Sequence, residues 1–134
     1  MEVINVSVDR LTEVEDFLKS VPGIKIDIEV IMNASLLFDN DKIVGIISFE
    51  SFGRTGLIRY FIFKQIVDEG ILLSLFTNLI DTANTKGISR IIALVSNEDT
   101  IPIFEFLGFK LIDSKQIYIE EKKILNEANK LPSI

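Results

Sequence analysis

The sequence predicts one α/β domain with a mixed, mostly antiparallel central sheet flanked by helices. Its 134 residues are the length of a single domain. Three strand-like runs between residues 34 and 63 follow one another through short turns, which indicates an antiparallel meander. A continuous apolar run at residues 90–95 is typical of a parallel strand covered on both faces. We expect the domain to span residues 1–120, followed by a C-terminal helix or tail at 121–134.

The N-terminal segment predicts a strand, a helix and one ambiguous stretch. Apolar and polar residues alternate over residues 4–8, which suits a strand. Residues 9–21 carry apolar side chains at helical spacing, with Asp9 as the expected N-cap and a Pro-Gly pair directly after them. Residues 24–32 also alternate, so a strand is one prediction there and a short helix or loop is the other.

The predicted meander consists of strands at residues 34–38, 43–52 and 57–63. An Asp-Asn-Asp-Lys turn joins the first two, and a Gly-Arg-Thr-Gly turn joins the last two. The third strand is rich in aromatic and β-branched residues, which favour sheets. Connections this short place each strand antiparallel to the next.

The second half begins with an amphipathic helix. Residues 71–86 carry an apolar stripe, and Gly87 gives this helix a good end. The apolar strand at 90–95 follows, and then a short helix at 100–107 that stops at Gly108.

The C-terminal segment is less patterned. Residues 109–112 and 116–120 predict two short strands or one bent strand. Residues 121–130 predict a solvated helix or a tail. The sequence contains no repeat and no linker that would divide the chain.

The composition excludes several kinds of chemistry. The chain has no histidine and no cysteine, so it cannot build a Ser-His-Asp triad, a thiolate nucleophile, a disulfide or a metal site on these residues. We predict no metal site. The net charge of −6 argues against a nucleic-acid partner, which needs a positive face. Apolar runs are far shorter than the about 18 residues of a spanning helix, so we expect a cytoplasmic protein without membrane association.

The order of the elements and one motif resemble the GNAT superfamily of N-acetyltransferases. Residues 96–109 read Ser-Asn-Glu-Asp-Thr-Ile-Pro-Ile-Phe-Glu-Phe-Leu-Gly-Phe, which is similar to the family's N-x-x-A-x-x-x-Y-x-x-x-G-F in spacing and ending. The turn before residue 43 and the run Ile-Val-Gly-Ile-Ile after it look like the family's second and third strands. The resemblance covers roughly residues 1–120. It implies a GNAT-like fold, acetyl-CoA or CoA as cofactor, and a small-molecule or protein amine as acceptor.

The resemblance also locates a cofactor loop, which is degenerate here. In the family, the helix after the fourth strand presents backbone N–H groups to the pyrophosphate of coenzyme A, and the loop reads Q/R-x-x-G-x-G/A. Residues 67–72 match this pattern only at its first glycine, Gly70. The resemblance therefore implies cofactor contacts at Gly70, Ile71 and Leu72, although a leucine at position 72 would crowd the approach to the phosphates.

Two acidic residues oppose phosphate binding at this loop. Asp68 and Glu69 place negative charge beside the expected polyanion. The alternative interpretation is that both carboxylates stabilise the helix dipole and take the place of the phosphates. Lys64 and Gln65 lie just upstream and could supply a cation and a donor to a phosphate placed differently.

Further cofactor contacts follow from the same resemblance. It implies that the pantetheine arm pairs with the backbone of Phe61, Ile62 and Phe63. Asn97 follows a strand end, where its side chain could bond the pantetheine arm or cap the next helix. Phe104 stands where the family has the tyrosine that protonates the departing thiolate. Phenylalanine has no proton to give, so Phe104 is a cofactor contact or a core aromatic.

Three polar residues of the meander are candidates for the chemistry. Glu50 lies late in its strand and could be the general base for the amine, or a solvated strand-end carboxylate. Tyr60 would lie near the acyl group, or be a strand aromatic whose hydroxyl reaches the sheet edge. Arg59 could bind an acidic group of a substrate, or extend along apolar surface to the edge.

Two functions remain open from the sequence. The first is an acyl-CoA-dependent N-acetyltransferase in which an amine attacks the thioester directly, without the usual tyrosine acid and without an intact pyrophosphate loop. The second is a non-catalytic, degenerate GNAT-fold module with a binding or regulatory role. Ten phenylalanines and a positive mean hydropathy leave apolar surface for a partner or for a homodimer.

Overall fold

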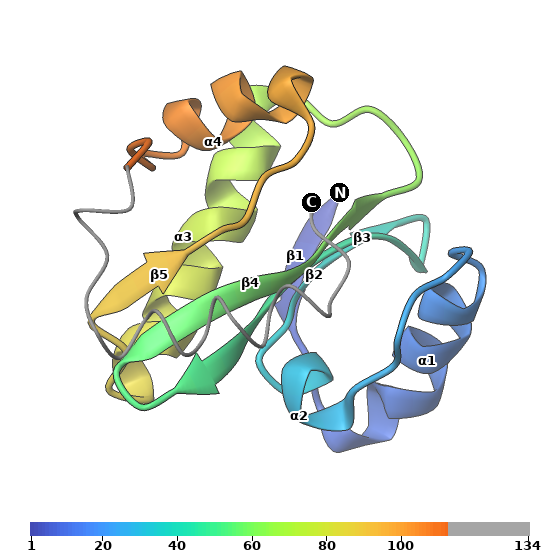
Figure 1. Ribbon diagram of the computed structural model, residues 1–134. Coiled ribbons are helices and arrows are strands. Elements are labelled where there is room, and N and C mark those ends of the chain that lie inside the picture. Colours follow the sequence, from blue (N-terminus) through green and yellow to red (C-terminus); the bar gives the residue numbers. More distant parts are fainter. Residues whose placement is uncertain (113–134) are drawn as a thin grey trace. The chain divides into compact units, whose positions relative to one another are not determined.

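Among residues 1–112, five strands form one sheet in the order β1-β2-β3-β4-β5 (Figure 1). The computed structural model describes residues 1–112. The first four strands pair antiparallel with their neighbours, and β5 pairs parallel with β4. The predicted mixed, mostly antiparallel sheet is confirmed. The strands are β1 (Glu2–Asn5), β2 (Ser35–Asp39), β3 (Lys42–Phe52), β4 (Thr55–Phe63) and β5 (Arg90–Ile92).

The chain divides into two compact units, Met1–Ile92 and Ala93–Ile134. The first contains the whole sheet together with α1 (Leu11–Lys19), α2 (Ile28–Ile31), α3 (Glu69–Thr85) and the 3-10 turn η1 (Val8–Arg10). The expected single domain of residues 1–120 runs past the described residues and stays a prediction.

Helices cover both faces of the sheet (Figure 1). Leu36 and Phe38 of β2 belong to a core cluster with residues of α1 and α2. Ser35 points to the opposite face, because side chains alternate along a strand. There its hydroxyl accepts a hydrogen bond of 2.9 Å from Asn78 of α3. The sheet is therefore a layer between α1 and α2 on one side and α3 on the other.

The meander follows from local sequence signals. The β2–β3 turn places Asn40 and Asp41 at φ of 50° and 63°, the left-handed region that Asn and Asp tolerate best after glycine. Leu36, Ile46 and Tyr60 come from three successive strands and are completely or almost completely buried under α1 and α2. Their burial fixes the register, because a slip by one residue would turn each side chain to the other face.

Each of the two central ladders contains one extra residue. The β3–β4 register passes from Ser48↔Tyr60 to Phe49↔Ile58, so Arg59 is the extra residue of β4. A bulge leaves such a residue outside the regular ladder and bends its strand. The buried side-chain amide of Asn33 donates a hydrogen bond of 2.9 Å to the Phe49 carbonyl. It also accepts a hydrogen bond from Lys86 at the end of α3. These contacts tie both helical layers to the bulge.

The ambiguous segment at 24–32 is a short helix, α2, and not a strand. Its N-cap is Asp27, whose side chain accepts a hydrogen bond of 3.1 Å from the Glu29 N–H. Side-chain capping at Asp27 favours helix over the alternating pattern.

The N-terminal elements differ from the prediction in their bounds. The first strand ends at Asn5, before the expected residue 8, because Val8–Arg10 already form a 3-10 turn. Asp9 is therefore not the N-cap: Ser7, in an extended conformation, holds that position. A hydrogen bond with the Ser7 side chain lowers the pKa of Asp9, which lies in the first turn.

The second unit contains η2 (Glu98–Thr100) and α4 (Ile101–Phe106) in its described part. The rings of Phe104 and Phe109 pack edge to face with centroids 5.1 Å apart. Residues 109–112 are not a strand, which contradicts the prediction. Their expected partner at 116–120 and the expected helix or tail at 121–130 lie outside the described residues.

Candidate functional site

The parallel pairing of β4 with β5 is short, and this defines the candidate site. The ladder joins Thr55, Gly56 and Leu57 to β5 and ends there. β4 continues to Phe63, and we call its residues 58–63 the β4 extension. The predicted strand at 90–95 is thus too long, since β5 ends at Ile92 where its ladder ends.

The β4 extension keeps backbone groups directed away from β3. The Lys64 N–H donates a hydrogen bond of 2.9 Å to the Val44 carbonyl of β3. Because peptide groups alternate in direction along a strand, the N–H of Phe63 points to the side where β5 would continue. The three residues predicted to pair with a pantetheine arm, Phe61, Ile62 and Phe63, all lie in this extension.

Gly45 of β3 creates the space for the Phe63 ring. A Cβ built on Gly45 would lie 2.6 Å from Cδ1 of Phe63, so no larger residue fits without moving the ring. The Phe63 ring also packs edge to face against Phe61, with centroids 5.2 Å apart. The end of the β4 extension is thus held by ring packing as well as by pairing with β3.

Glu50 and Arg59 form an ion pair at the bulge. Nη1 of Arg59 donates to Oε1 of Glu50, and the side chains are 7% and 27% exposed, respectively. Arg59 therefore does not extend to solvent as one interpretation expected. Glu50 is the counter-ion of a buried guanidinium and not a solvated strand-end carboxylate.

The hydroxyl of Tyr60 is used by the connection between α1 and α2. It donates a hydrogen bond of 2.7 Å to the Lys25 carbonyl and accepts one of 2.9 Å from the Asp27 N–H. Tyr60 is 1% exposed, and this burial raises the pKa of its hydroxyl. These contacts give Tyr60 a structural role within the fold, whereas the sequence suggested either a place near the acyl group or a hydroxyl at the sheet edge.

The N-terminus of α3 is capped by its own carboxylate. Oδ1 of Asp68 accepts a hydrogen bond of 2.9 Å from the Ile71 N–H. The Asp68 carbonyl accepts one of 3.0 Å from the Leu72 N–H. Leu72 is 8% exposed, so its side chain is in the core and not at the surface of the first turn. Of the predicted cofactor contacts, Ile71 and Leu72 therefore already donate within the first turn.

The loop before α3 directs its polar side chains elsewhere. Nζ of Lys64 lies 4.7 Å from the ring centroid of Phe17, which belongs to α1. Nε2 of Gln65 donates a hydrogen bond of 3.3 Å to Oδ2 of Asp39 at the end of β2. Neither contact is with the first turn of α3, and each side chain that could serve a phosphate placed differently has a partner within the protein.

The last two predicted site residues belong to the second unit. Oδ1 of Asn97 accepts 3.0 Å from the Asp99 N–H, so Asn97 caps η2. Phe104 is 4% exposed and packs on Phe109. Both contacts match the structural alternatives that the sequence left open, helix cap and core aromatic.

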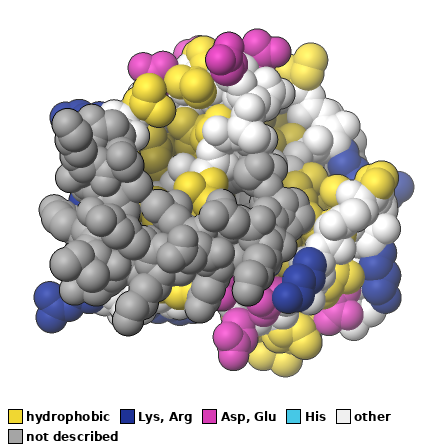
Figure 2. Space-filling model, viewed as in Figure 1, with side chains coloured by type: hydrophobic (Ala, Val, Ile, Leu, Met, Phe, Trp, Pro, Cys, Tyr) yellow, Lys and Arg dark blue, Asp and Glu magenta, His cyan; other side chains and the backbone are white. Residues whose placement is uncertain are grey.

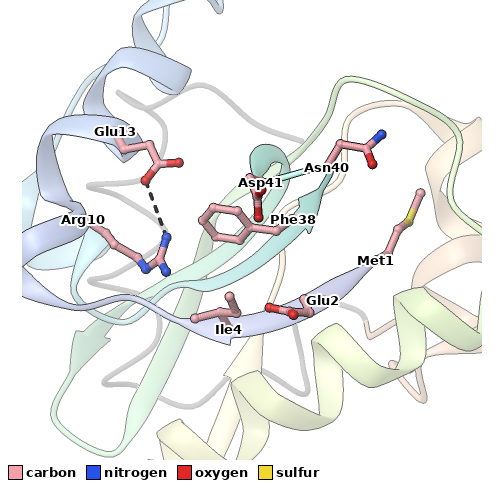
Figure 3. Close-up of a pocket in the computed structure, with 8 residues that line it drawn as sticks. All are labelled: Met1, Glu2, Ile4, Arg10, Glu13, Phe38, Asn40 and Asp41. Carbon is pink, nitrogen blue, oxygen red and sulfur yellow. Dashed lines mark ion pairs between the residues drawn. The ribbon is translucent and has the colours of Figure 1, made fainter.

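A cavity of about 560 Å³ lies beside the edge strand β1 (Figure 3). Arg10 covers the Phe38 ring at 4.7 Å and pairs with Glu13 at 3.6 Å. No predicted site residue is among the described residues that line it, and it is separate from the β4 extension. Its lining comes from β1, the η1–α1 segment, β2 and the following turn: Met1, Glu2, Ile4, Arg10, Glu13, Phe38, Asn40 and Asp41.

Among residues 1–112, no group of three or more acidic side chains is placed to hold a metal ion. No helix in this part of the chain combines the length and apolarity needed to cross a bilayer.

Comparison of the structure with solved structures shows the fold of the GNAT acetyltransferases. N-acetylglutamate synthase from Neisseria gonorrhoeae, solved with coenzyme A and N-acetyl-glutamate, matches at a TM-score of 0.70 and 20% identity over 98% of this chain. A GNAT-family acetyltransferase from Streptococcus pneumoniae matches at 0.62 and 17% identity, covering 87% of this chain and 91% of its own. Arabidopsis thaliana Naa50, solved with a bisubstrate analogue, matches at 0.61 and 19% identity, with 89% of each chain covered.

These likenesses are of structure and not of sequence. No protein-family model and no curated protein sequence matches the chain. The match covers 33% of the N-acetylglutamate synthase chain, so this chain spans about a third of that protein's length.

Proposed function

We propose that this chain transfers an acetyl group from a coenzyme A thioester to an amine. The observation that carries the proposal is the β4 extension, which continues past the end of the β4–β5 ladder at Leu57. Support comes from solved structures of the same fold that hold coenzyme A or an analogue of it. In the proposed complex the pantetheine arm lies along residues 61–63 and pairs with their backbone, as a strand would.

The proposed reaction is a direct attack. The nitrogen of a neutral amine adds to the thioester carbonyl carbon, the C–N bond forms, and the C–S bond breaks. The departing thiolate and the proton lost from nitrogen together give the free thiol. Holding the amine and the thioester in line supplies much of the rate in such reactions.

The bulge at Arg59 is the proposed source of stabilisation for the developing oxyanion. Because a bulge takes a residue out of the regular ladder, it can present a peptide N–H to a ligand. We propose that the acceptor's amine contacts the Glu50 carboxylate beside the bulge, where Arg59 holds that carboxylate in place. We assign Tyr60 no proton transfer, since its hydroxyl already bonds Lys25 and Asp27.

Titration with acetyl-CoA, followed by an amine screen with detection of released thiol, tests the proposal. Saturable binding and thiol release that requires an amine are the expected results. A Phe63→Pro variant removes the N–H that faces the proposed arm and should weaken binding. An Ile66→Pro variant is the matched control, because Ile66 is 98% exposed in the following loop. No binding of acetyl-CoA at millimolar concentration would overturn the proposal.

A binding module without turnover is the second candidate. Phe104 at the family's tyrosine position favours it, because it offers no proton to a leaving thiolate. Large apolar side chains are also exposed, and hydrophobic patches are visible in Figure 2. Donor binding without thiol release for any amine would support this candidate over the first. Among the described residues, the most exposed of these side chains are Ile66, Leu111, Val8, Met1 and Ile28.

A further inference from the structure

The first turn of α3 already carries a negative group where a helix N-terminus would otherwise attract an anion. The Asp68 carboxylate accepts from the Ile71 N–H at 2.9 Å. It is also close to Gly70, since a Cβ built there would lie 3.3 Å from Oδ1 of Asp68. An N-cap carboxylate satisfies orphan N–H groups and compensates the helix dipole, which are the two features an incoming phosphate would use.

A second carboxylate follows directly. Glu69 is exposed in the first turn of α3, so the turn carries two negative charges within two residues. A diphosphate group brought to this turn would meet like charges at short range. At such distances the repulsion is only partly screened at physiological ionic strength.

The preceding loop does not compensate this charge. Lys64 lies over the Phe17 ring, and the Gln65 amide bonds Asp39. Moving Lys64 to the helix would give up its cation–π contact. Gln65 is uncharged, so even its reorientation would leave the charge of the first turn unchanged.

The β4 extension has the opposite character. Its proposed contact with the donor is made by backbone groups of residues 61–63, and the side chains of these residues are uncharged. A pantetheine arm consists of amides and methylenes with no charge, so the acids at α3 do not oppose it. Recognition at the two ends of the donor is therefore separable.

We propose that Asp68 and Glu69 exclude the diphosphate of coenzyme A from the α3 N-terminus, so that the donor is recognised through its acylated pantetheine arm. This inference rests on the proposed function. Asp68 is then a specificity residue that reduces the preference for the nucleotide half of the donor. A pantetheine thioester without any phosphate is predicted to bind as well as acetyl-CoA.

Calorimetric titration with acetyl-CoA and with acetyl-pantetheine tests the inference. We expect dissociation constants within threefold of one another for the unchanged protein. Raising the salt concentration should strengthen binding of acetyl-CoA and leave that of acetyl-pantetheine unchanged, because salt screens the repulsion.

Asp68→Asn is the decisive variant, since asparagine caps a helix as well as aspartate while carrying no charge. It should tighten acetyl-CoA binding about threefold to tenfold, in line with removing one like charge near the diphosphate. Binding of acetyl-pantetheine should not change. Asp81→Asn, which removes an exposed carboxylate further along α3, is the matched control and should affect neither ligand.

The outcomes separate this inference from the proposed function. Acetyl-CoA bound more than tenfold tighter than acetyl-pantetheine, with no effect of Asp68→Asn, would overturn the inference and leave the proposed function intact. Absence of binding by both thioesters would overturn the proposed function and the inference together.

Discussion

The β4 extension and the first turn of α3 are close in sequence, but they differ in what they can offer a ligand. Residues 61–63 of the extension have uncharged side chains, and the Phe63 N–H is directed away from β3. The first turn of α3 has two acids, and its Ile71 and Leu72 N–H groups already bond Asp68. The β4 extension can therefore offer backbone groups to a ligand, whereas the first turn of α3 already satisfies these two N–H groups itself.

The largest effect is expected at the ion pair beside the bulge. Glu50→Gln leaves the Arg59 guanidinium, 7% exposed, without its counter-ion. Loss of one partner of a buried pair costs about 3–5 kcal/mol, and we expect the lower end because Glu50 is itself 27% exposed. Urea unfolding measures the change.

A double variant gives the control for that prediction. Glu50→Leu combined with Arg59→Met replaces the pair with apolar side chains and should be much closer to the unchanged protein in stability. If Glu50→Gln alone left the free energy of unfolding unchanged, the buried pair would not be a structural element of the β4 extension.

Two glycine substitutions sharpen the comparison: one at Gly45 of β3, which faces the Phe63 ring, and one at Gly70 in the first turn of α3. Gly45→Ala places a Cβ 2.6 Å from the Phe63 ring, and we expect a loss of about 1–3 kcal/mol in stability together with weaker donor binding. Gly70→Ala should keep donor binding and change stability by at most about 1 kcal/mol, because the helix preference of alanine is opposed by a Cβ placed 3.3 Å from the capping Oδ1 of Asp68. Unfolding curves and titrations of both variants provide the test, and weaker acetyl-CoA binding in Gly70→Ala would contradict it.

Tyr60→Phe should separate stability from ligand binding within β4. The variant leaves the Asp27 N–H and the Lys25 carbonyl without their partner, which costs about 1–3 kcal/mol. We expect donor affinity at 25 °C to stay the same, since the hydroxyl bonds the α1–α2 connection. An equal loss of affinity and stability would assign Tyr60 to the site.

The same tyrosine predicts a pH dependence. Burial raises the pKa of Tyr60 above that of the unfolded chain, so the unfolded state releases this proton first as pH rises. Its contribution to stability is complete below the ordinary phenol pKa of about 10 and is lost above it. The fall in stability above pH 10 should be smaller in Tyr60→Phe than in the unchanged protein.

The smallest effect is expected at the helix cap. Asp68→Ala removes the acceptor of the Ile71 N–H and should cost about 1 kcal/mol, whereas Asp68→Asn should be nearly neutral. Thermal unfolding of the two variants side by side measures the difference. Equal stability of both would mean that the Asp68 side chain does not cap α3 in solution.

Local signals predicted most of the fold, and long-range pairing explains what they missed. The meander and α3 follow from turn residues and apolar spacing, which act within a few positions. The bulge at Arg59 depends on how β4 aligns with β3, which no pattern within β4 contains. The length of β5 likewise depends on where β4 departs from it, so an apolar run at 90–95 predicted three residues too many.

The elements that carry the candidate site residues were predictable from the sequence, but the contacts of those residues were less so. The resemblance placed residues 61–63 and the start of α3 together, and the structure has both in one unit. It could not foresee that Arg59 would bind Glu50, because that contact spans two strands and needs the bulge. The sequence offered stabilisation of the helix dipole as one interpretation of Asp68, but it did not show that the carboxylate would cap α3 through the Ile71 N–H.

The three-residue ladder between β4 and β5 also has a kinetic consequence. The β2–β3 and β3–β4 pairs form through short turns, whereas the β4–β5 pair, like the β1–β2 pair, must wait until the helical segment between its strands has been placed. Non-local contacts are slow to form, so we expect β5 to join the sheet after the β2–β3–β4 meander during folding. So short an attachment also opens at low free energy, and amides of β5 should exchange with deuterium sooner than those of β3.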